Sequence, residues 1–97
     1  MRRLLRALVE QLRHHALLHR ANTLSRRADA LIQQRNRLPL ASSGRMLLNA
    51  RALELACEAS ALRAEAMGDE AMAAEHRVEA AEFGRRARLH QSWGAFA

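Results

Sequence analysis

The chain has 97 residues, and a chain of this length forms one small domain that buries about two thirds of its unfolded surface. Its sixteen basic residues are all arginine and outnumber ten acidic residues, so the formal net charge of +6 permits an acidic partner such as nucleic acid without requiring one. The single cysteine excludes an internal disulfide, and no apolar run approaches the ~18 residues of a membrane span, so we predict a cytoplasmic protein that does not enter a membrane.

Helix-breaking residues divide the chain at a few separated places. The first helix should stop before Pro39, because the residue that precedes a proline is pushed out of the α region. The glycines mark the other boundaries, and nothing in the chain reads as a strand. The predicted helices cover residues 2–37, 43–67 and 69–89. We therefore predict a single all-α domain over 1–91, a three-helix bundle or helical hairpin, followed by a short aromatic tail over 92–97.

The first predicted helix carries two apolar stripes on nearly opposite sides. The first consists of Leu5, Leu8, Val9 and Leu12, and the second of Leu17, Ala21, Leu24, Ala28 and Leu31. No glycine or proline between them lets the helix bend to bring the stripes together, so only one can face the protein's own core. A row of large exposed apolar residues is costly on a monomer, which predicts that the first stripe is a dimer or partner interface. The alternative is that these turns fold onto the third helix.

The second predicted helix is apolar almost all round, which is typical of a central helix. Ser42 or Ser43 is expected to cap its start and Gly68 to end it. A short connection predicts that it folds back along the second stripe of the first helix. Small residues on the two helices should allow their backbones to approach closely.

Residues 61–83 resemble a tetratricopeptide-type helical hairpin. Gly68 lies at the turn, and Ala61, Ala73 and Ala80 lie where such a hairpin needs close helix contact. The resemblance implies a tight antiparallel hairpin and not membership of that family, because no second copy of the repeat exists. The sequence leaves open which side of the third helix packs inward. One candidate row is Ala71, Ala74, Val78 and Ala81, and the other is Met72, Ala80 and Phe83.

Two of the three aromatic residues, Trp93 and Phe96, follow a basic run near the end of the chain. That run is made of Arg85, Arg86 and Arg88. Arginines that hold phosphates beside a tryptophan that stacks on a base would suit nucleic acid. Because the aromatic residues follow the arginines and do not alternate with them, the pattern favours docking into apolar pockets of a partner or second protomer. In a third interpretation the tail folds back over the protein's own helices.

Arginines also recur along the first helix. Arg13, Arg20 and Arg27 are spaced by seven residues and lie on one side. Such a stripe would bind a nucleic-acid backbone without reading its sequence. The alternative is that acidic residues of the following helices balance it, since residues 46–82 hold eight acidic residues and three arginines.

No residue pattern indicates catalysis. His15 and His19 are one helical turn apart, but no second cluster completes a metal site with them, and Cys57 lies on an apolar row where a packed thiol is expected. We predict no enzymatic activity, no cofactor, no metal and no small-molecule substrate. The predicted function is that of a helical interaction protein (an adaptor, chaperone-like subunit or inhibitor) that binds itself or a larger assembly. The alternative is a small nucleic-acid-backbone binder.

Overall fold

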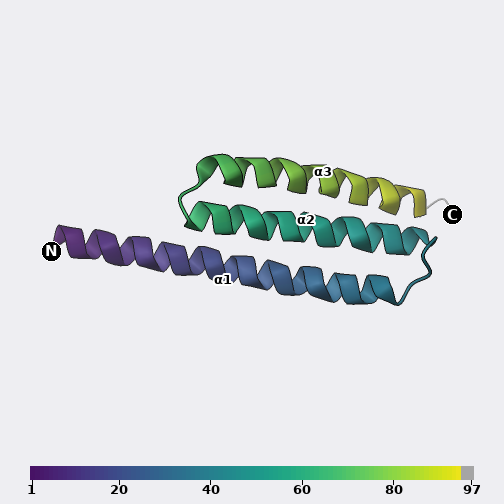
Figure 1. Cartoon of the computed structure of the whole chain (residues 1–97), viewed down its shortest axis with the longest axis horizontal. Coiled ribbons are helices and arrows are strands. Elements are labelled where there is room, and N and C mark those ends of the chain that lie inside the picture. Colours follow the sequence, from purple (N-terminus) through teal and green to yellow (C-terminus); the bar gives the residue numbers. More distant parts are fainter. Residues whose placement is uncertain (95–97) are drawn as a thin grey trace.

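The computed structural model describes residues 1–94, which form three α-helices (Figure 1). The helices are α1 (Arg2–Asn36), α2 (Ser43–Ala66) and α3 (Glu70–Gly94). No strand occurs among the described residues, so the all-α prediction is confirmed. α3 continues past its predicted end near Leu89 and includes Trp93, so the first part of the expected tail is helical. Phe96 lies outside the described residues.

α2 lies in the middle, with α1 packed along one side and α3 along the other (Figure 1). Within residues 1–94, α1 and α3 make no close backbone contact with each other. The array is elongated, with extents of 62 × 23 × 18 Å. α1 is the longest helix, and its N-terminal end projects beyond the α2–α3 hairpin (Figure 1). The central position predicted for the second helix is therefore confirmed.

The turn between α2 and α3 is a Schellman motif centred on Gly68. This residue has a φ of 77°, in the left-handed region that glycine adopts without steric cost. The Gly68 N–H donates to the Glu65 carbonyl, and the Asp69 N–H donates to the Ala64 carbonyl. The Asp69 side chain then accepts a hydrogen bond from the Met72 N–H and caps α3. These bonds explain why the hairpin reverses sharply where the sequence predicted it.

Alanines line both helix contacts. Where the structure describes burial, over residues 1–93, the fully or almost fully buried apolar residues are all alanine, namely Ala21, Ala28, Ala50, Ala52, Ala59, Ala61, Ala73, Ala80 and Ala87. On α1 and α3 they recur every seven residues, which keeps one narrow seam facing α2 along each helix. A methyl side chain lets neighbouring helix backbones approach closely. The described helices therefore pack through close backbone contact and without large, fully buried side chains. Ala61, Ala73 and Ala80 are the residues for which the sequence predicted this contact.

Candidate interaction surface

The first apolar stripe of α1 is exposed to solvent. Leu5, Leu8, Val9 and Leu12 are 61%, 54%, 63% and 65% exposed, whereas Ala21 and Ala28 on the opposite side are 0% and 3% exposed. Residues 1–12 are all exposed because α2 ends near His14, where the His14 Nδ1 lies 3.0 Å from the Ala66 carbonyl oxygen. We call residues 2–13 the overhang. Folding of these turns onto the third helix is excluded within the chain, because α2 separates α1 from α3.

Unpaired arginines accompany the leucines of the overhang. Arg2, Arg3 and Arg6 are exposed, and none forms an ion pair among residues 1–94. Arg6 precedes Arg13 by seven residues and therefore extends the predicted arginine stripe into the overhang. From the sequence, Arg6 is expected broadly opposite the apolar stripe, whereas about 100° per residue places Arg2 and Arg6 along one border of it.

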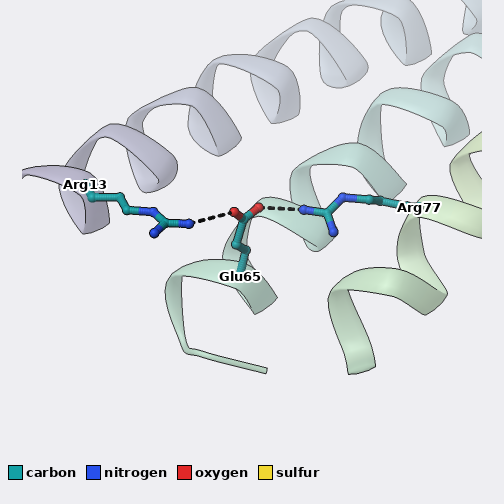
Figure 2. A network of polar contacts seen from close by, with 3 residues as sticks. All are labelled: Arg13, Glu65 and Arg77. Atoms are coloured by element: carbon teal, nitrogen blue, oxygen red, sulfur yellow. Dashed lines mark hydrogen bonds and ion pairs between the residues drawn. The ribbon is translucent and has the colours of Figure 1, made fainter. Parts of the chain in front are cut away.

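The arginine stripe of α1 lies beside acidic residues of α2. Glu65 accepts from Arg13 on one carboxylate oxygen, at 3.4 Å, and from Arg77 of α3 on the other, at 2.5 Å (Figure 2). Arg20 lines a groove of about 400 Å³ together with Glu58 and Glu65. Arg27 is exposed. Arg13 is therefore paired with a carboxylate that competes with a phosphate for its guanidinium group, and Arg20 shares its groove with two carboxyl side chains.

Replacing Glu65 with glutamine should lower the free energy of unfolding by about 0.5–1.5 kcal/mol, because each ion pair with a partly exposed arginine contributes about 0.2–1 kcal/mol. Urea unfolding followed by circular dichroism measures this difference. Glu10→Gln is the matched control, since Glu10 is exposed and forms no ion pair among residues 1–94. Equal effects of the two substitutions would show that the ion pairs of Glu65 with Arg13 and Arg77 do not stabilise the fold.

The C-terminal arginines are also engaged with a carboxylate. Arg85 and Arg86 both pair with Glu82, and the hydrogen bond from Arg85 is the main reason that the pKa of the Glu82 carboxyl is lowered. The Arg86 guanidinium also lies 5.3 Å from the centre of the Phe83 ring, a cation–π distance. Arg88 is exposed. The arginines that the sequence grouped as phosphate contacts therefore do not form one free cluster.

Trp93 lies on the last turn of α3 and is 61% exposed. Its ring packs edge-on against His90, with ring centres 5.5 Å apart. This position contradicts the interpretation in which Trp93 folds back over the protein's own helices. The tryptophan remains available to another molecule, at the end of the array away from the overhang (Figure 1).

The candidate metal ligands and the candidate nucleophile of the sequence do not form a site in the described part of the chain. His15 and His19 are exposed, and no group of three His, Cys, Asp or Glu side chains in the described part of the chain is placed to hold a metal ion. Cys57 is half-buried, and this burial, with a smaller contribution from Glu79, raises the pKa of its thiol. A raised pKa keeps the thiol protonated, which disfavours a nucleophilic role.

Comparisons of the chain with protein-family models, curated proteins and solved structures give no match. Among the helices formed by residues 2–94, none combines the length and the apolar character needed to cross a bilayer.

Proposed function

We propose that the protein is a non-enzymatic helical interaction module, acting as an adaptor, chaperone-like subunit or inhibitor, and that the overhang of α1 is its docking element. The observation that carries the proposal is the exposure of Leu5, Leu8, Val9 and Leu12 on one side of a helix that projects beyond the rest of the fold. Amphipathic helices bind partners by laying such a face against a complementary apolar surface. The remainder of α1 is held by α2, so the overhang is ordered before binding and loses little conformational entropy.

The charges on the overhang indicate the chemistry of the partner surface on which it would dock. Residues 2–13 carry four arginines and one glutamate, so they favour an apolar protein surface with an acidic rim. Trp93 supplies a second apolar contact at the far end, which suits a module that touches a larger assembly at two places. A lone cysteine fits a reducing compartment, which supports a proposed location in the cytoplasm.

The double substitution Leu8→Glu with Leu12→Glu tests this proposal. Both side chains are more than half exposed, so the melting temperature and helical circular dichroism should stay close to those of the wild type. Self-association, or binding of an isolated partner, should fall by at least about tenfold, because charges would enter an apolar interface. Light scattering measures the mass, and titration with the purified partner measures the affinity.

A matched control places the same charge on α1 away from the overhang. Gln33→Glu with Gln34→Glu changes exposed residues of the same helix and should leave mass and binding unaltered. If the Leu8 and Leu12 variant unfolds at a much lower temperature but keeps its mass and its binding, the stripe supports the fold and the proposed function is wrong.

A further inference from the structure

α3 carries an exposed apolar row on the side away from α2. Ala73, Ala80 and Ala87 face α2 and are buried, whereas Val78 is 69% exposed. The outward row consists of Ala71, Ala74, Val78 and Ala81, all exposed. It is one of the two rows that the sequence offered for internal packing, and the structure places it at the surface. The small side chains of this row leave space for large apolar side chains from another helix.

An acidic edge runs beside this row. About 100° per residue places Glu75, Glu79 and Glu82 along one border of the row. Residues 70–82 hold four glutamates and one arginine, of which Glu82 also pairs with Arg85 and Arg86, and the overhang holds four arginines and one glutamate. The two segments therefore have complementary charge, similar length of about 18 Å, and one apolar stripe each.

We propose that the overhang of one copy of this chain packs on the outer face of α3 in a second copy. This proposal rests on the proposed function and names the partner surface for it. Within one chain the contact cannot form, because α2 holds α1 and α3 apart and the apolar face of the overhang points away from α2. Leu5, Leu8 and Leu12 would fill the spaces between Ala71, Val78 and their neighbours, and each leucine would lose its contact with water.

The positions of the charged edges determine the orientation of this pairing. Viewed from its N-terminus, the overhang has Arg2, Arg6 and Arg13 on the clockwise side of its apolar stripe. α3, viewed in the same way, also has its acidic edge on the clockwise side. Two facing helices bring their clockwise edges together only when they run antiparallel. An antiparallel pair therefore aligns the arginines with the glutamates, whereas a parallel pair places them on opposite sides.

A charge exchange in the full-length chain tests the proposal by sedimentation over a range of concentrations. Glu75→Arg with Glu82→Arg, or Arg2→Glu with Arg6→Glu, should each weaken self-association by at least about tenfold because like charges then oppose each other. The four substitutions together should restore the wild-type association to within about threefold. Asp29→Arg with Glu58→Arg is the control, since it changes the net charge equally at positions outside α3 and the overhang. Helical circular dichroism confirms that each variant folds.

The outcomes separate this proposal from the proposed function. A wild-type chain that stays monomeric throughout, or a fourfold variant that stays dissociated, overturns pairing between the overhang and α3. The same holds if the Leu8 and Leu12 substitutions abolish association while the Glu75 and Glu82 substitutions leave it intact, although the overhang would then still be a docking element. Loss of association in both single-surface variants, with recovery in the fourfold variant, supports the proposal.

Discussion

Replacing Ala59 with leucine should lower the free energy of unfolding by about 1–3 kcal/mol, the range typical of added methylenes in a well-packed core. Ala59 is 0% exposed and lies one turn before Arg63, which donates to Asn22 and Ser25 of α1, so it is on the side of α2 that faces α1, where Ala21 is also 0% exposed. A leucine at this seam would push α1 and α2 apart, because Ala59 and Ala21 are both fully buried and the seam holds only methyl side chains there. Urea unfolding measures the change in the free energy of unfolding. The dependence of this free energy on urea concentration shows whether the surface area exposed on unfolding is unchanged.

The control for this substitution is Ala30→Leu, which adds the same atoms to an exposed position of α1. Alanine and leucine have similar helix propensities, so this variant should change stability by less than about 0.5 kcal/mol. If Ala59→Leu were as mild as Ala30→Leu, the helices would not be held at the separation that the alanine seam implies.

The order of the helices followed from simple features of the sequence. A helix that is apolar nearly all round has to lie between two others, and a short connection forces antiparallel neighbours. The opposite stripes of α1 could also be recognised, because large residues such as Leu8 and Leu12 make the helical period visible. Their exposure then follows from length: α1 has 35 residues and α2 has 24, so α2 cannot cover all of α1.

The hydrophobic pattern alone did not decide the inward side of α3, although the resemblance to a tetratricopeptide-type hairpin placed Ala73 and Ala80 at the contact. Alanine contributes little apolar area, so Ala73 in a tight seam and Ala74 at the surface look the same in a hydrophobic pattern. The end of α3 near Leu89 was also wrong, because Ser92 and Gly94 disfavour a helix but do not forbid one as proline does. The Arg13–Glu65–Arg77 contacts depend on the register between three helices, which no local spacing reveals.

Substituting Gly68 should destabilise the protein in the order valine, alanine, asparagine, with the largest loss for valine at about 1–2 kcal/mol or more. The reason is the backbone: Gly68 has a φ of 77°, which costs an L-residue about 1–2 kcal/mol and a β-branched residue more, whereas asparagine tolerates it best. A Cβ added at Gly68 meets no atom within 4 Å, so the backbone conformation and not a clash at Cβ sets the ranking. Thermal unfolding of the three variants measures this order of destabilisation.

Gly44→Ala is the matched control for the hairpin glycine. Gly44 lies in the first turn of α2 with ordinary helical geometry, and an added Cβ would be 3.4 Å from the Leu38 Cδ1, which is close to an ordinary contact. Alanine there should be neutral or stabilising, because it restricts the unfolded chain. Gly68→Ala should lower the melting temperature while Gly44→Ala does not. Equal behaviour of the two would mean that the left-handed backbone at Gly68 does not govern the stability of the turn between α2 and α3.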